Sequence, residues 1–158
     1  IGCYLVNTAR FIFGAEPLRV AGALDLDPRF GVDRLASMIL DFGGRQAVGL
    51  CGTQVQYYQR IQIVGTKGRL EIEIPFNAPP DRPCRLALDR TGALDGGGVE
   101  ILEMAVCNQF TLQAEAFAAA ILDGRPQPVP LEDAVANMAC IDAIARSSRT
   151  GAWERPVA

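Results

Sequence analysis

The sequence predicts an α+β fold: a mainly antiparallel open sheet of about six strands with helices packed on one face. Three observations predict it. Helical periodicity occurs only near the two ends of the chain, strand-like segments follow one another between them, and short glycine turns join neighbouring strands. The chain has 158 residues, 49% of them hydrophobic, which predicts a single domain over residues 1–158 with a substantial core.

The individual elements follow from periodicity and from turn residues. In chain order we expect a helix at 2–13, an extended stretch at 18–24, a loop at 25–33, strands at 34–42, 45–54, 60–64, 69–74, 84–89 and 99–104, and helices at 109–122 and 131–148. Gly14 and Gly151 follow the first and last helices, as C-terminal glycines do. Gly43-Gly44 marks a hairpin turn between the first two of the listed strands.

The hairpin around residues 65–68 has a predictable register. The expected pairs are Val64 with Arg69, Ile63 with Leu70, Gln62 with Glu71, Ile61 with Ile72, and Arg60 with Glu73. This register makes one face aliphatic and places opposite charges together on the other. A slip of one residue would destroy both matches, so the register is strongly specified.

The strands at 34–42 and 45–54 carry apolar side chains on both faces. Leu35 and Ile39 lie on one face, and Met38 lies on the other. Helices on one side of the sheet leave the second face as an apolar patch, which favours a homo-oligomer contact; a loop such as 77–82 folding over it is the alternative. If that face is the interface, Lys in place of Met38 or Leu50 should give monomers.

Composition excludes several classes of function. The net charge of −3 and the absence of a basic run argue against nucleic-acid binding, and the apolar run at 116–122 is far short of the roughly 18 residues that span a bilayer. There is no His and no CxxC, which argues against a zinc site. The five cysteines are expected to be reduced, mostly buried thiols of a cytoplasmic protein; no signal peptide is visible.

Glycine motifs do not predict a nucleotide site within this chain. Neither GxGxxG nor GxxxxGK[ST] occurs, residues 65–68 form a hairpin tip, and residues 96–98 lead into a strand rather than into a helix. Without His, proton transfer must use Tyr, Lys, Asp or Glu.

The first helix carries the remaining candidates. Tyr4 and Asn7 are three residues apart and share a face, and Arg10 follows one turn later. By residue type alone, a packed ring with a satisfied hydroxyl is the commoner explanation of such a pair.

A family resemblance changes this reading. The run from Gly2 to Gly14, followed by Glu16-Pro17, resembles the start of the C-terminal domain of the glucose–fructose oxidoreductase / inositol dehydrogenase family of NAD(P)-dependent oxidoreductases. The resemblance continues in order through residues 31–33, 41–44, 64–70, 75–76, 108–110, 115–117, 131–134 and 147–153. It therefore covers nearly the whole chain.

The resemblance implies an N-terminal Rossmann domain that binds NAD or NADP and is absent from this chain, which opens at Ile1 within an expected helix. It implies that the open sheet makes the oligomer contact. Tyr4 occupies the Tyr/His position of the family's Asp-x-Gly-x-Tyr/His pattern. With Tyr rather than His at this position, the chain most resembles the sugar oxidoreductase and dihydrodiol dehydrogenase branches of the family. The preceding Asp and the Lys of the family's Glu-Lys-Pro motif are not in this chain.

These implications define the expected chemistry. Tyr4 is the candidate catalytic residue, exchanging a proton with an alcohol or carbonyl oxygen of a sugar, polyol or dihydrodiol. A tyrosine hydroxyl ordinarily has a pKa of about 10, so a nearby cation such as the family's Lys is needed. Asn7 and Arg10 are candidates for binding and orienting substrate, or for packing the two domains together, and the structural role is favoured for Arg10. This chain alone is expected to bind no cofactor and no metal and to be inactive.

A different class of function stays open. The chain could be a non-catalytic dimerisation or ligand-binding module that retains the fold, because fold does not imply activity. In that case Tyr4→Phe would be silent in any assay.

Overall fold

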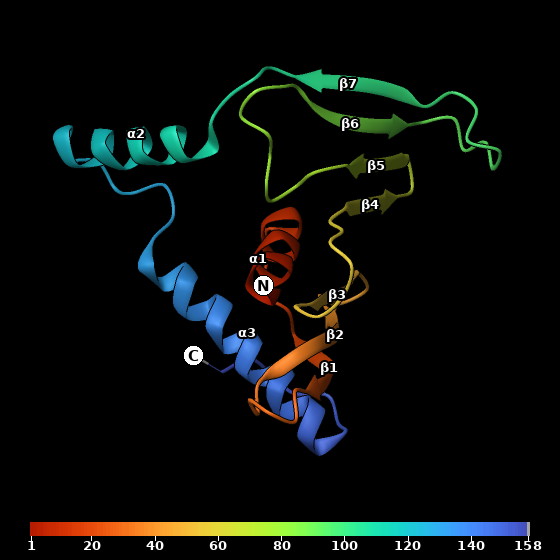
Figure 1. The fold of residues 1–158 in the computed structure, drawn as a ribbon, viewed down its shortest axis with the longest axis vertical. Coiled ribbons are helices and arrows are strands. Elements are labelled where there is room, and N and C mark those ends of the chain that lie inside the picture. Colours follow the sequence, from red (N-terminus) through yellow and green to blue (C-terminus); the bar gives the residue numbers. More distant parts are fainter. Residues whose placement is uncertain (158) are drawn as a thin grey trace. The chain divides into compact units, whose positions relative to one another are not determined.

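A computed structural model describes residues 1–157, which form two compact units (Figure 1). The first contains residues 1–56 and the chain from residue 129 onward, and the second contains residues 57–128. Every strand pairing in the described residues is antiparallel, which confirms the α+β class. The strands fall into two open sheets, with the orders β1-β2-β3 and β4-β5-β6-β7, rather than into one.

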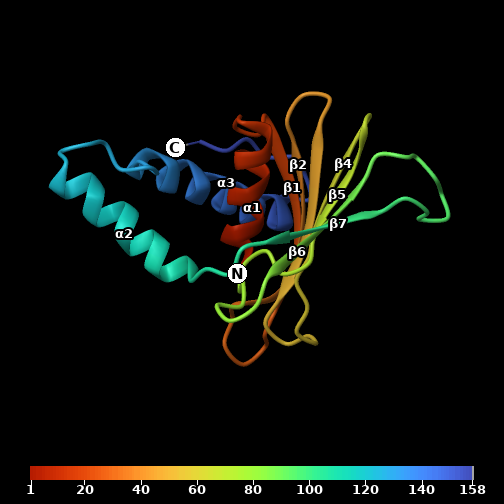
Figure 2. The same cartoon turned by 90° about the horizontal axis from the view of Figure 1, so that it is seen from above.

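The first unit places two helices on one face of the three-stranded sheet (Figure 2). Its elements are α1 (Gly2–Phe13), β1 (Arg19–Leu26), β2 (Asp33–Asp41), β3 (Gln46–Gly52) and α3 (Leu131–Thr150). These bounds agree closely with the expected ones, because each helix ends at a left-handed glycine, Gly14 or Gly151. Gly43 and Gly44 both have positive φ, as the tight β2–β3 turn requires.

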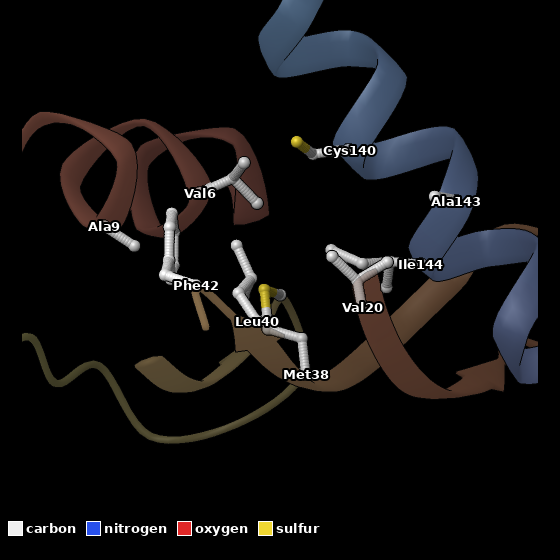
Figure 3. Packing of buried hydrophobic residues seen from close by; sticks show 9 residues of the cluster. All are labelled: Val6, Ala9, Val20, Met38, Leu40, Phe42, Cys140, Ala143 and Ile144. Atoms are coloured by element: carbon white, nitrogen blue, oxygen red, sulfur yellow. The ribbon is translucent and has the colours of Figure 1, made fainter. Parts of the chain in front are cut away.

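The core of this unit lies between the helices and the sheet. Figure 3 shows Val6 of α1 and Cys140 of α3 above Leu40 of β2. The buried cluster comprises Val6, Ala9, Val20, Met38, Leu40, Phe42, Cys140, Ala143 and Ile144. Burial raises the pKa of the Cys140 thiol to about 11, so this cysteine packs as a small hydrophobe.

α3 crosses β1 at very close range. A Cβ placed on Gly22 would lie 2.6 Å from Cγ2 and 2.9 Å from the carbonyl oxygen of Ile144. The hydroxyls of Ser147 and Ser148 accept hydrogen bonds from the backbone N–H groups of Gly22 and Leu24, at 3.1 and 2.9 Å. The helix therefore satisfies donors on the outer edge of β1 that would otherwise remain unpaired.

The contact face of α3 is not the stripe that its larger apolar side chains form. Leu131, Val135 and Met138 recur at helical spacing, but their side chains are 72%, 56% and 51% exposed. The buried residues of this helix are Ala139, Cys140, Ala143, Ile144 and Ser147. Apart from Ile144, which packs on Gly22, the buried side chains of this face are small, and Leu131, Val135 and Met138 lie on another face.

The second face of the three-stranded sheet is open and apolar. Val48 and Leu50 are 78% and 62% exposed, and Ile39 is 37% exposed on the same face. Met38 is only 4% exposed, and it pairs with Gly49 while Leu50 pairs with Ser37. Since side chains alternate along a strand, Met38 and Leu50 lie on opposite faces, and the expectation that both probe the open face was wrong for Met38.

The second unit contains the four-stranded sheet and one helix. Its elements are β4 (Ile61–Gly65), β5 (Gly68–Ile72), β6 (Cys84–Asp89), β7 (Glu100–Met104) and α2 (Gln109–Leu122). α2 begins at Asn108, whose side-chain oxygen accepts hydrogen bonds from the backbone N–H groups of Phe110 and Thr111.

The β4–β5 hairpin has the expected register for four of the five pairs, from Val64 with Arg69 to Ile61 with Ile72. The fifth pair was wrong. Arg60 forms its ion pair with Glu71, and Glu73 lies 3.8 Å from Arg85 of β6 instead. The ladder ends at the pair of Ile61 with Ile72, so Arg60 and Glu73 both lie outside it and Arg60 pairs with Glu71 within β5.

Candidate functional site

α1 divides its side chains between a buried and an exposed face. Val6, Ala9 and Arg10 are buried against the rest of the first unit. Tyr4, 56% exposed, and the exposed Asn7 lie one turn apart on the other face. The structure thus places Tyr4 and Asn7 together at the surface, whereas Arg10 is buried.

Arg10 is the centre of a polar network, although it is only 6% exposed. Its Nε and Nη2 donate to the two carboxylate oxygens of Glu16, at 2.8 and 2.7 Å. Nη2 also donates to Oδ1 of Asp133 at 2.8 Å, and Nη1 donates to the Asp133 carbonyl at 3.3 Å and to Oδ1 of Asn137 at 3.5 Å. The network ties α1 to the first turns of α3.

The network accounts for every donor of the Arg10 guanidinium, which has five N–H groups. The hydrogen bonds with Glu16 are the largest cause that raises the Arg10 pKa above its ordinary value, and they outweigh the opposing effect of burial. Arg10 is therefore a permanent cation whose charge is paired within the first unit.

Asn7 joins the same network from the exposed face of α1. Its Nδ2 donates to Oδ2 of Asp133 at 3.2 Å. Asn137 adds a further link between the two helices, because its Nδ2 donates to the carbonyl oxygen of Cys3 at 3.3 Å. The position of Asn7 beside Tyr4 therefore depends on α3.

Sequence reasoning identified the α1 residues but not their partners on α3. From the sequence, Asp133 is recognisable only as a first-turn acid that is favourable to the helix dipole, and Asn137 carries no signal of its own. The signal available in the sequence was Arg10 itself. Because Arg10 follows Ala9 on the buried face of the helix, its charge needs carboxylates nearby. Glu16, six residues on, was the only one that local spacing suggested.

Within the described residues, neither a metal-binding cluster nor a dinucleotide-binding fold unit is present. Within residues 1–157, no group of three or more Cys, Asp or Glu side chains could hold a metal ion. The antiparallel sheets contain no strand–helix–parallel strand unit of the kind that binds dinucleotides. None of the described helices combines the length and apolarity needed to cross a membrane.

Comparison with known proteins identifies the family. Residues 1–71, which include α1 with Tyr4 and Asn7, match the GFO/IDH/MocA C-terminal domain. The chain is also 43% identical over 155 residues to an uncharacterized oxidoreductase, ORF334, of Rhizobium meliloti, covering 98% of this chain and 46% of that protein. Residues 1–71 thus carry the GFO/IDH/MocA C-terminal domain, and the whole chain is homologous to the C-terminal half of an oxidoreductase. The resemblance seen in the sequence motifs is thereby confirmed.

Other members of the group have named activities. A D-xylose 1-dehydrogenase [NADP(+)] of Haloarcula marismortui is 30% identical over 95 residues, which cover 58% of this chain and 26% of that enzyme. The crystal structure of an aldose-aldose oxidoreductase from Caulobacter crescentus, complexed with glycerol, superposes with a TM-score of 0.77 at 26% identity. The superposition covers 98% of this chain and 45% of the C. crescentus chain.

The fold extends to more distant proteins. KijD10, a 3-ketoreductase from Actinomadura kijaniata, shares the fold with a TM-score of 0.81 at 23% identity, over 93% of this chain and 45% of that chain. This chain thus spans about half the length of the R. meliloti and C. crescentus proteins.

Proposed function

We propose that this chain is the substrate-side and oligomerisation domain of an NAD(P)-dependent oxidoreductase acting on an alcohol or carbonyl group of a sugar, polyol or dihydrodiol. The observation that carries the proposal is the pair Tyr4 and Asn7, exposed together on α1 within the segment that matches the family. The names of the xylose dehydrogenase and the aldose-aldose oxidoreductase support a sugar-type substrate, and the former supports NADP.

The roles follow from side-chain chemistry. Tyr4 would exchange a proton with the substrate oxygen, since a phenol hydroxyl is both donor and acceptor. The nicotinamide cofactor would carry the hydride and would be held by residues outside this chain. A phenol ordinarily ionises at about pH 10, so a cation supplied with the cofactor-binding part would be needed for proton transfer near neutral pH.

Asn7 and Arg10 would serve this site differently. Asn7 is exposed beside Tyr4 and would contact and orient substrate. Arg10 has its five donors engaged with Glu16, Asp133 and Asn137, so it would orient substrate only indirectly, by fixing α1 against α3.

The test uses the full-length product of the gene that encodes this chain, assayed with NAD or NADP against aldoses, polyols and dihydrodiols. Tyr4→Phe should lower kcat by about 100-fold or more with little change in KM, as loss of a general acid–base does. Tyr57→Phe is the matched control, because that ring is 94% exposed and belongs to the other unit. If both variants retain full activity, the non-catalytic alternative is favoured.

The chain by itself is proposed to be inactive. Calorimetric titration of the 158-residue chain with NADP should give no binding heat, because its described residues form no dinucleotide fold. Micromolar binding would contradict the assignment of the cofactor to another part. The five cysteines are proposed to remain reduced, in keeping with a cytoplasmic enzyme.

The open face of the three-stranded sheet is the proposed oligomer contact. Its exposed Val48 and Leu50 form part of an apolar surface bounded by the ion pair of Arg19 with Asp41 at one end. Leu50→Lys should convert the oligomer to monomers in sedimentation velocity. Leu94→Lys, at a fully exposed loop position, should leave it intact. A Leu50→Lys protein that still sediments as an oligomer would reject this surface.

A further inference from the structure

The contact between Asn7 and Asp133 fixes the direction in which the Asn7 amide faces. Nδ2 of Asn7 lies 3.2 Å from Oδ2 of Asp133. An ionised carboxylate accepts hydrogen bonds and donates none, so only the NH₂ group of Asn7 can face it. The carbonyl oxygen of Asn7 is therefore directed away from Asp133.

The Asp133 carboxylate is itself held in place. Its other oxygen, Oδ1, accepts a hydrogen bond from Nη2 of Arg10 at 2.8 Å. It lies in the first turn of α3, where the helix dipole stabilises a negative charge. A carboxylate bound on both oxygens has a defined orientation, and it presents Oδ2 to the Asn7 amide.

We propose that Asp133 is a positioning residue that makes Asn7 a hydrogen-bond acceptor beside Tyr4, and that this selects a neutral sugar or polyol whose hydroxyl donates there. The inference rests on the proposed function and deepens it. A carboxylate or phosphate at that point would meet the Asn7 carbonyl and the Asp133 charge. It would find no donor on Arg10, whose N–H groups are all engaged.

Asp133→Asn has a specific expected consequence. The introduced amide must keep its oxygen toward Arg10, which only donates, and so turns its NH₂ group toward Asn7. The Asn7 amide then reverses, accepts that hydrogen bond and presents its own NH₂ group outward. The variant therefore converts an acceptor into a donor with almost no change in shape.

The first experiment measures this change in polarity with the full-length gene product. Its substrates are D-xylose and its 2-, 3- and 4-deoxyfluoro analogues, because fluorine cannot donate a hydrogen bond. In the unaltered enzyme one fluoro position should lower kcat/KM by about tenfold, mainly through KM, and Asp133→Asn should abolish that discrimination. Glu132→Gln is the matched control, since it removes a charge from the same helix turn and should retain the discrimination.

Two further variants separate the amide effect from effects on folding. Glu16→Gln removes the other carboxylate partner of Arg10 but does not contact Asn7, and it should also retain the discrimination. Asn7→Leu removes the acceptor while leaving the Arg10 contacts in place, and it should lose the discrimination. An unchanged fluorine pattern in both Asp133→Asn and Asn7→Leu overturns the inference while the proposed function stands.

The second experiment needs no turnover. In ¹H–¹⁵N spectra of the 158-residue chain, Asn7→Leu identifies the side-chain NH₂ signals of Asn7 by their disappearance. Those signals should shift strongly in Asp133→Asn and stay in place in Glu132→Gln. If they do not move in Asp133→Asn, the inference fails. If the full-length protein oxidises or reduces none of the sugars, polyols or dihydrodiols, the proposed function fails, and these spectra still decide the orientation of Asn7.

Discussion

The pairing of Arg10 predicts a sharp non-additivity in the stability of the first unit. The guanidinium is 6% exposed and is shared by Glu16 and Asp133, whose side chains are 56% and 31% exposed. Glu16→Gln or Asp133→Asn alone leaves one carboxylate, and each should cost about 1.5 kcal/mol, a modest figure because both acids are partly hydrated. The double variant leaves a buried charge without a counter-ion and should cost about 4.5 kcal/mol.

The double variant should therefore exceed the sum of the single costs by about 1.5 kcal/mol. Arg10→Met should cost less than the double variant, because it leaves no buried charge and both carboxylates can be hydrated. The assay is urea unfolding followed by the fluorescence of Trp153, the single tryptophan, whose ring lies 4.6 Å from the Arg19 guanidinium in the same unit. Additivity within about 0.3 kcal/mol would refute the shared-charge reasoning.

Three other predictions concern the core and the carboxylates. Gly22→Ala should destabilise the first unit by about 1–3 kcal/mol, because the new Cβ would overlap the side chain and carbonyl of Ile144; an unchanged urea midpoint would contradict this. The backbone N–H of Thr91, followed by its hydroxyl, donates the hydrogen bonds that hold the pKa of Asp89 below its ordinary value. The free energy that ionised Asp89 contributes to folding is therefore present above the unfolded pKa of about 3.9, and it is lost as pH falls through the lower folded pKa. Asp89→Asn should accordingly weaken the acid dependence of thermal unfolding, measured by circular dichroism, and an equally steep dependence would oppose that assignment. The buried Cys140 should resist iodoacetamide at pH 8 until urea is added, as read by mass spectrometry of the labelled peptide.

Local patterns were sufficient where neighbouring residues in the chain make the contacts. The β4–β5 register follows from alternation over ten residues, since a slip would turn aliphatic side chains to the charged face. The Gly43-Gly44 turn and the glycine ends of α1 and α3 were predictable for the same reason, because each depends on the φ angle of one or two residues.

Patterns were insufficient where an element offers two apolar faces. α3 carries Leu131, Val135 and Met138 on one face and small residues such as Ala143 on another. Periodicity favours the stripe of Leu131, Val135 and Met138, but α3 packs on the sheet through the other face, where Ile144 lies against Gly22. The same limit placed Met38 on the wrong face, because both faces of β2 read as apolar.

By itself, the sequence determined the class of fold, the register of the β4–β5 ladder and the presence of Tyr4, Asn7 and Arg10 on one short helix, because these depend on residues close together in the chain. Only the tertiary structure decided that Asp133 meets Asn7 and Arg10, which precede it by 126 and 123 positions in the chain. Hydrogen-bond partners so distant carry no local periodicity. These partners are fixed by how α1 and α3 pack on the sheet, and that packing sets the orientation of the Asn7 amide.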